Sequence, residues 1–219
     1  MNRYQTILFD LDGTLLDSGE GVLTCVRLAL ETLGKPIPSP AVLRSFIGPP
    51  LLDSFLRVGC TPEEARQAIE IYRGRYTTVG KFEAFVYPGM QQLLQQLQAE
   101  GCRLYVATSK PENTSVEILE HFGLAPYFRR IAGASADGLR STKSQVLSYL
   151  LEEAAPLDRP LMVGDTVYDV VGSRSHGIDC VGVKWGFGVV DEMLQAGALA
   201  VVDTMDQLHD FIEKGRIPV

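Results

Sequence analysis

The chain has 219 residues, of which 46% are hydrophobic, so it can bury a substantial core in one domain or in one domain that carries an insertion. A formal net charge of −7 argues against a nucleic-acid polymer as partner, because proteins that bind nucleic acids usually present a basic face. No apolar run approaches the roughly 20 residues that cross a bilayer, and the first residues lack the apolar segment of a signal peptide. We therefore expect a cytoplasmic protein without a membrane partner.

The first predicted element is a buried strand that ends in two carboxylates. Residues 7–9 form a short apolar run, and Asp10, Asp12 and Gly13 follow directly. Because side chains alternate along a strand, the two acids should leave on the same side, while Gly13 lets the backbone turn away. A fold keeps such a pair mainly when a cation lies between the acids or when one of them stays protonated. The motif therefore suits a metal-assisted nucleophile beside an acid/base, although an ordinary Asp-Gly turn is the alternative.

The next stretch, residues 19–84, has a purely helical pattern that accommodates about four helices and no strand. Apolar residues recur at helical spacing before Gly34, and the order Thr61-Pro62-Glu63-Glu64 predicts a capping box with proline at the first helical position. We assign residues 17–86 to an inserted helical-bundle domain.

The four cysteines of the chain form no Cys-x-x-Cys pair, and we expect them to be small buried free thiols. They are Cys25, Cys60, Cys102 and Cys180.

From residue 87 onward, short apolar runs alternate with amphipathic helical patterns. We predict strands at residues 103–107, 130–133, 160–163, 180–183 and 200–202, and helices at 90–100, 112–122, 142–154, 168–176, 190–196 and 206–214. Strands separated by helices make right-handed crossovers and hence a parallel sheet covered on both faces. Residues 1–16 and 87–219 are therefore assigned to one α/β domain with a Rossmann-like sheet. In such sheets ligands bind beyond the carboxyl ends of the strands, where Asp10 and Asp12 lie.

Other predicted strands bring further polar groups to this edge. Thr108 and Ser109 follow the second strand and can hold a phosphate oxygen, or they can simply cap the next helix. Lys143 stands near a helix start, where the helix dipole does not favour it; it either points to the sheet edge or is an ordinary surface lysine. Asp165 and Asp169 follow a later strand, as site residues or as turn and cap residues. Several such strand ends together are harder to explain as separate accidents.

This ordered set of motifs resembles the haloacid dehalogenase (HAD) superfamily of phosphohydrolases. Its first motif is matched by DLDGT at Asp10–Thr14, its second by ATSKP at Ala107–Pro111, its third by Lys143 and its fourth by GDTVYD at Gly164–Asp169. The helical stretch is similar to the cap that one branch of the superfamily inserts after the first motif. The resemblance thus covers nearly the whole chain.

Within the superfamily the chain looks most similar to the phosphoglycolate phosphatase-like group. The shared features are the DLDGTLLDS run, FIGPPL at Phe46–Leu51, YPGM at Tyr87–Met90 and the GVKWGFG segment at the end of the fifth strand. That group also contains proteins with other substrates, including nucleoside monophosphates. The resemblance implies a small phosphorylated metabolite as the substrate, and a monomer or homodimer.

The resemblance also implies a mechanism, namely Mg²⁺-dependent hydrolysis of a phosphate monoester through an aspartyl-phosphate. Asp10 would be the nucleophile and Asp12 the general acid and then base. The magnesium ligands would be the Asp10 carboxylate, the Asp12 backbone carbonyl and Asp165. Asp169 would orient water or hold Lys143.

The remaining implied roles concern the phosphoryl group and the cap. The catalytic residues would be Asp10, Asp12, Thr108 and Lys143, and the phosphate would be bound by Gly13, Thr108, Ser109 and Lys143. Closure of the cap would use hinges near Asp17–Gly21 and Val86–Gly89. Arg44 and the loop at Gly48–Pro50 are candidates to line the inner surface of the cap.

Several rival functions stay open at this point. A 5′-nucleotidase would keep the mechanism, whereas a β-phosphoglucomutase-type phosphomutase shares the motifs but returns the phosphoryl group to a sugar. A true dehalogenase is disfavoured because that branch lacks the second acid, which is Asp12 here. A response-regulator receiver is shorter, has no helical insertion and carries its phosphorylated aspartate on the third strand. The intact acids argue against a catalytically retired binding protein.

Overall fold

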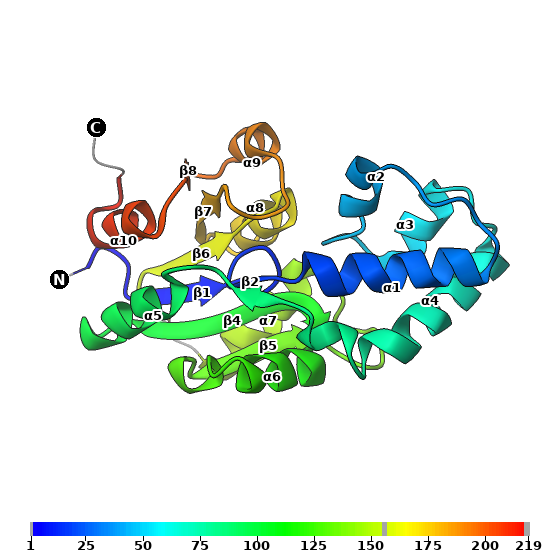
Figure 1. Cartoon of the computed structure of the whole chain (residues 1–219). Coiled ribbons are helices and arrows are strands. Elements are labelled where there is room, and N and C mark those ends of the chain that lie inside the picture. The colour runs from blue at the N-terminus through cyan, green and yellow to red at the C-terminus, as the bar shows by residue number, and fades with distance from the viewer. Residues whose placement is uncertain (1, 155–156, 217–219) are drawn as a thin grey trace. The chain divides into compact units, whose positions relative to one another are not determined.

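The computed structural model describes residues 2–154 and 157–216 (Figure 1). The chain divides into two compact units, each described by itself. The core unit consists of Met1–Leu16 and Val86–Val219, and the helical unit consists of Asp17–Phe85. Among the described residues, no helix combines the length and the apolar character that crossing a bilayer would require.

A six-stranded sheet forms the centre of the core unit. Its strands are β1 (Thr6–Phe9), β4 (Arg103–Pro111), β5 (Arg130–Ala134), β6 (Pro160–Gly164), β7 (Asp179–Val183) and β8 (Ala200–Val202). They are arranged in the order β5-β4-β1-β6-β7-β8, and every neighbouring pair is parallel. The strand order reverses between β1 and β6, which is the switch point where doubly wound sheets bind ligands. The predicted α/β class with a Rossmann-like parallel sheet is confirmed.

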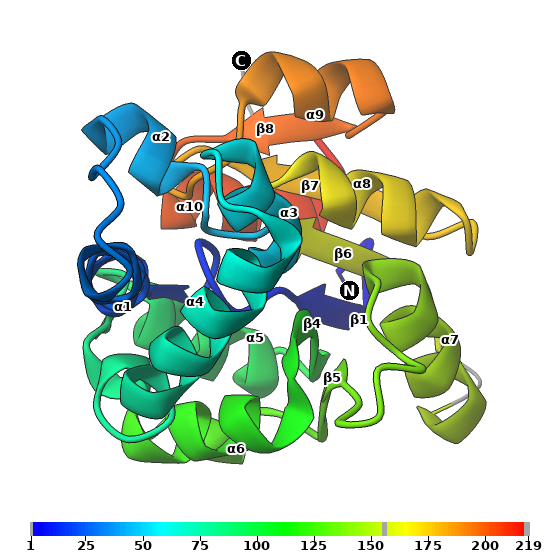
Figure 2. The ribbon, with the colours of Figure 1, turned by 90° about the vertical axis from the view of Figure 1, so that its right-hand side faces the viewer.

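Helices cover both faces of this sheet. One face carries α5 (Met90–Ala99), α6 (Glu112–His121) and α10 (Met205–Lys214), and the other carries α7 (Lys143–Ala154), α8 (Val167–Arg174) and α9 (Val190–Ala196). Figure 2 shows α7 and α8 together on one side of the strands and α5 on the other. A short 3₁₀ turn, η2 (Ala125–Tyr127), follows α6.

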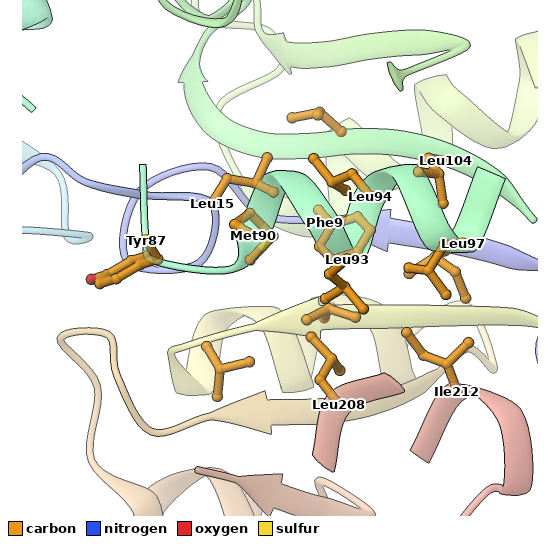
Figure 3. Packing of buried hydrophobic residues seen from close by; sticks show 14 of the residues in the cluster. Phe9, Leu15, Tyr87, Met90, Leu93, Leu94, Leu97, Leu104, Leu208 and Ile212 are labelled. Atoms are coloured by element: carbon orange, nitrogen blue, oxygen red, sulfur yellow. The ribbon is translucent and has the colours of Figure 1, made fainter. Parts of the chain in front are cut away.

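Alternation along the strands builds two cores, one under each layer of helices. Ile7 and Phe9 of β1 belong to the cluster formed with α5 and α10, whereas Leu8 between them belongs to the cluster formed with α7 and α8. Figure 3 shows the first cluster, with Leu93 and Leu97 of α5 lying against the strands. Because β1 is buried on both faces, it reads in the sequence as a continuous apolar run.

The helical unit contains four α-helices among its described residues, as the sequence predicts. They are α1 (Gly19–Thr32), α2 (Pro40–Arg44), α3 (Leu51–Arg57) and α4 (Pro62–Tyr76), followed by the 3₁₀ turn η1 (Gly80–Phe82). The predicted capping box is present, because the Thr61 hydroxyl accepts from the Glu64 N–H and the Glu64 carboxylate accepts from the Thr61 N–H. The inner face of α4 buries Ala65, Tyr72 and Tyr76.

Two features of the chain differ from the sequence-based prediction. β4 runs to Pro111, beyond the predicted end at Ala107; its register with β5 shifts after Ala107, and Pro111 pairs again with Ala134. Ser, Lys and Pro are poor sheet residues, which is why the pattern stops early. The strands β2 (Leu16–Asp17) and β3 (Phe85–Val86), which pair with each other, were not predicted because two residues carry no periodicity. The four cysteines are free and buried, as expected.

Candidate active site

The carboxyl end of β1 leads directly into a tight turn that carries the first motif. The Asp10 N–H donates to the Val163 carbonyl of β6 at 2.9 Å, so the sheet fixes the backbone of this residue. The chain then folds back on itself: Leu15 donates to the Leu11 carbonyl at 3.0 Å, and Gly13 donates to the Leu16 carbonyl at 2.8 Å. Gly13 has a φ of 77°, the left-handed conformation that glycine adopts readily.

Lys143, the first residue of α7, lies buried between two carboxylates. Its Nζ is 2.7 Å from Asp10 Oδ1 and 2.8 Å from Asp169 Oδ1, and it donates to the Ala107 carbonyl at 2.7 Å. The first two contacts are ion pairs and the third is a hydrogen bond, so the ammonium group has three oxygen atoms close to it. The side chain is 4% exposed, so the alternative of a solvated surface lysine is wrong.

The charges of this cluster shift one another's protonation. Burial raises the pKa of Asp10 to about 6, against the opposing charge of Lys143, while Asp169 and Asp12 repel the anion and add to the rise. Burial alone would lower the pKa of Lys143, but Asp10 and Asp169 outweigh it and raise that pKa. Asp10 is therefore largely anionic at neutral pH and Lys143 is cationic.

Asp165 follows β6 at the neighbouring strand end and is fully buried. Its Oδ2 accepts the Phe187 N–H at 2.8 Å, whereas none of the described residues donates a hydrogen bond to its buried Oδ1. Burial raises the pKa of Asp165 well above its ordinary value, and repulsion by Asp169 and Asp10 adds to the rise. A buried carboxylate oxygen without a donor calls for a cation or a proton.

The carboxylates of these strand ends converge. One oxygen each from Asp10, Asp165 and Asp169 lies within 4.8 Å of the others. Asp169 has protein partners at both oxygens: its Oδ1 forms an ion pair with Lys143, without a hydrogen bond, and its Oδ2 accepts the Thr166 N–H at 3.0 Å and the Thr166 hydroxyl at 2.9 Å. Of its two expected roles, Asp169 has the contacts for holding Lys143, and it also caps α8. Asp10 and Asp165 are then the carboxylates that fit a hard divalent cation.

Asp12 contacts a lysine that the sequence analysis did not single out. Its Oδ1 lies 2.7 Å from Lys110 Nζ, and the two side chains are 19% and 9% exposed. The available signal was position: Lys110 lies two residues beyond Thr108, at the same end of β4. The expected use of the Asp12 backbone carbonyl as a metal ligand stays a prediction.

The hydroxyl residues of the second motif lie in the irregular end of β4. Thr108 is buried and its Oγ1 accepts the Lys110 N–H at 3.3 Å. The alternative that Thr108 or Ser109 caps α6 is wrong, because Pro111 occupies the N-cap position and no side chain caps this helix. Phosphate binding by Thr108 and Ser109 stays a prediction.

A second element that sequence reasoning missed is the segment Lys184–Gly188 after β7. Besides the Phe187 N–H on Asp165, its Trp185 Nε1 donates to the Thr14 carbonyl at 3.1 Å. The GVKWGFG run indicates a family resemblance. Neither hydrophobic periodicity nor motif spacing predicts, however, that the backbone of this segment contacts Asp165.

Comparison with known proteins agrees with this geometry. The family model of haloacid dehalogenase-like hydrolases matches residues 7–183. A 5′-nucleotidase from Pseudomonas aeruginosa is 42% identical over 193 residues, which cover 87% of either chain. The tyrosine-protein kinase PtkA from Mycobacterium tuberculosis is 41% identical over 209 residues, covering 94% of this chain and 72% of that protein.

Two further proteins are similar over most of the chain. A phosphoglycolate phosphatase from Pseudomonas savastanoi pv. phaseolicola is 29% identical over 211 residues, covering 92% of this chain and 77% of that protein. The crystal structure of a predicted phosphatase from Clostridium acetobutylicum aligns with a TM-score of 0.88 at 42% identity, covering 95% of this chain and 98% of that one. The chain therefore belongs to the haloacid dehalogenase-like hydrolases. The predicted membership in this superfamily of phosphohydrolases is confirmed, and with it the class of phosphoric monoester hydrolase.

Proposed function

We propose that this enzyme is a Mg²⁺-dependent phosphatase that hydrolyses a small phosphate monoester through an aspartyl-phosphate on Asp10. The observation that carries the proposal is the convergence of Asp10 and Asp165 beside the buried Lys143, together with the buried Asp165 Oδ1, to which none of the described residues donates. Asp10, Asp165 and the Asp12 carbonyl would hold the ion. When bound, Mg²⁺ would offset the negative charge of the phosphate and of the nucleophile.

Asp10 acts as the nucleophile and attacks phosphorus in line with the leaving oxygen. Its pKa of about 6 leaves it anionic at neutral pH, and Lys143 at 2.7 Å counters the repulsion between carboxylate and phosphate. Asp169 acts through Lys143, whose ammonium it holds in place. In phosphoryl transfer, positioning and charge stabilisation supply most of the rate gain, which is what this cluster offers.

Asp12 transfers the protons in both halves of the reaction. It protonates the leaving alkoxide and then, as a carboxylate, takes a proton from the water that attacks the aspartyl-phosphate. Such a positioned acid/base contributes about 10²–10⁴-fold to the rate. Lys110 holds Asp12 at 2.7 Å and orients it. Thr108, Ser109 and the Gly13 backbone bind the phosphoryl oxygens.

The helical unit acts as a cap that selects the leaving group. In this proposal Arg44 and the Gly48–Pro50 loop would contact the leaving group, and segments near Asp17–Gly21 and Val86–Gly89 would serve as hinges. Nucleoside 5′-monophosphates are the first substrates to test, because the relative named 5′-nucleotidase is 42% identical whereas the one named phosphoglycolate phosphatase is 29% identical. Phosphoglycolate and sugar phosphates follow.

The test is release of inorganic phosphate from p-nitrophenyl phosphate and then from that substrate panel, with Mg²⁺ and with a chelator. We expect Mg²⁺-dependent release by the wild type, loss of release in Asp10→Asn, and wild-type release by Asp191→Asn, which changes an exposed acid at the start of α9. Equal turnover by Asp10→Asn and the wild type would refute the proposal.

Two rivals are separated in the same assays. A phosphomutase would need a bisphosphate activator and would return the phosphoryl group to a sugar, so release of inorganic phosphate without an activator argues against it. A kinase activity like that in the name of PtkA would transfer label from γ-labelled ATP to a tyrosine peptide. The proposal predicts labelled inorganic phosphate or no reaction there, and labelled peptide would contradict it.

A further inference from the structure

The segment Lys184–Gly188, which we call the clamp loop, contacts Asp165 through its backbone. The Phe187 N–H donates to Asp165 Oδ2 at 2.8 Å. The contact uses one carboxylate oxygen and leaves the other, Oδ1, buried without a hydrogen-bond donor among the described residues. One oxygen of Asp165 lies within 4.8 Å of an oxygen of Asp10 and of Asp169. The clamp loop thus occupies Oδ2 of Asp165 and leaves Oδ1 without a protein donor among the described residues.

Two glycines bring backbone directly against the Asp165 carboxylate. A Cβ at Gly186 would lie 2.3 Å from the Asp165 Cβ and 2.4 Å from Oδ2, and a Cβ at Gly13 would lie 2.1 Å from Oδ2. Neither position leaves room for a side chain. Asp165 is therefore held between the clamp loop and the turn after β1, and its carboxylate has little freedom to rotate.

Trp185 links the clamp loop to the turn after β1. Its indole Nε1 donates to the Thr14 carbonyl at 3.1 Å, and Thr14 belongs to the same turn as Asp12 and Gly13. The ring is half-buried and tilted against Tyr87, with centroids 6.3 Å apart. The indole N–H thus makes a side-chain hydrogen bond from the clamp loop to the first motif, in addition to the Phe187 ring, which lies close to Gly13.

We propose that Trp185 is a positioning residue for the divalent cation: its hydrogen bond to Thr14 keeps the clamp loop on Asp165 and so aims Oδ1 at the ion. The inference rests on the proposed function, because it assumes a cation at Asp10 and Asp165. Groups that orient a metal ligand from outside the coordination sphere typically change metal affinity by 10–100-fold when removed.

The test is equilibrium binding of Mn²⁺, followed by loss of the free-ion electron paramagnetic resonance signal, with Mg²⁺ as competitor. Trp185→Phe keeps an aromatic ring and removes the N–H. We expect it to bind Mn²⁺ about tenfold more weakly or worse. Val189→Ala shortens an exposed side chain directly after the clamp loop, without a charge change, and should bind like the wild type.

A second variant acts without touching the indole. Gly186→Ala keeps Trp185 and the Phe187 N–H but places a methyl group against Asp165, and we expect it to lose at least as much Mn²⁺ affinity. If Trp185→Phe does not fold, Gly186→Ala still tests whether the contact between the clamp loop and Asp165 sets the affinity for Mn²⁺. A purely structural role for Trp185 would lower the melting temperature but leave the affinity of the folded protein unchanged.

The outcomes separate the two proposals. Wild-type protein that binds neither Mn²⁺ nor Mg²⁺ would overturn the proposed metal-dependent function and this inference with it. Wild-type binding together with unchanged binding in folded Trp185→Phe, or in Gly186→Ala, would overturn the inference alone. Weaker binding in both, with Val189→Ala unchanged, is the result that supports it.

Discussion

Lys143 lies between two buried acids. Its removal should lower both the free energy of unfolding and the turnover number. Without it, Asp10 and Asp169 would face each other uncompensated, and breaking a buried pair in this way costs about 3–5 kcal/mol. We expect Lys143→Met to lose turnover and to unfold at lower urea concentration. Lys184→Met removes a lysine of a surface pair, whose side chains are 59% and 54% exposed, and should change the free energy of unfolding by less than about 1 kcal/mol. Equal effects of the two variants would contradict this account of Lys143.

Asp10 makes the metal-free protein less stable as pH rises. Its pKa is raised in the fold from 3.8 to about 6, so the folded state binds the proton more tightly than the unfolded chain. The stability due to that proton is complete below pH 3.8 and is lost as pH rises through about 6. Asp10→Asn, a neutral substitute, should therefore match the wild type near pH 4 and exceed it by about 2–3 kcal/mol at pH 7.5 without metal. Denaturation at both pH values measures this; a constant difference between the variants would contradict it.

At the scale of single residues, the sequence predicts the acids well and their partners poorly. Asp10 and Asp165 stand at strand ends, where chain order alone brings them to one edge of the sheet. Lys110 and Trp185 carry no such signal. The first is one of many lysines, and the second acts through an indole N–H on a backbone carbonyl 171 positions away. Such contacts depend on tertiary distances that local pattern does not encode.

The helix α8 shows how one element makes room for a residue of another. A Cβ at Gly172 would lie 2.7 Å from Lys143 Cγ and 2.8 Å from Lys143 Cβ. Helix propensity alone predicts that Gly→Ala stabilises by about 1 kcal/mol. Overpacking against the base of Lys143 costs about 1–3 kcal/mol and displaces its ammonium from Asp10.

We therefore expect Gly172→Ala to lower both the melting temperature and the turnover number. Gly74→Ala in α4 is the matched control, because a Cβ there meets nothing within 4 Å. It should raise stability by about 0.8–1 kcal/mol and leave turnover unchanged. A stabilised and fully active Gly172→Ala variant would show that the position of Lys143 does not depend on the missing side chain at Gly172.

Elements with clear periodicity are predicted closely. The capping box of α4 and the alternation of helices and strands after residue 87 have strong local signals, and β1 is recognisable because both of its faces are buried. The end of β4 is not predictable in the same way. Its last residues have poor strand propensity, and pairing of Pro111 with Ala134 overrides that propensity.

On the scale of the whole molecule, an acidic chain concentrates a few positive charges where an anion must bind. The net charge is −7, yet Lys143 lies buried beside Asp10 and Lys110 lies half-buried beside Asp12. Strand order explains the location, because β1 and β6 adjoin at the switch point of the sheet. The proposed division of labour follows: the core unit carries the chemistry and the helical unit selects the substrate.

That division predicts how Arg44, an exposed residue at the end of α2, affects specificity. Arg44→Ala should lower kcat/KM for the best nucleoside monophosphate about tenfold, while p-nitrophenyl phosphate, which lacks the natural leaving group, should be affected less. Arg66→Ala changes an exposed arginine of α4, which is paired with Glu63 at the surface, and serves as the control. Equal loss on both substrates would count against a selecting role for Arg44.

If Asp10 attacks phosphorus, an acid quench during turnover should trap a covalent aspartyl-phosphate. A reaction with p-nitrophenyl phosphate and Mg²⁺ is quenched in acid within a turnover, and the peptides are examined by mass spectrometry. We expect one phosphoryl group on the peptide that carries Asp10, dependent on Mg²⁺ and absent from Asp10→Asn. Rapid turnover with no phosphoryl group on that peptide, or with the group on another residue, would contradict this role of Asp10.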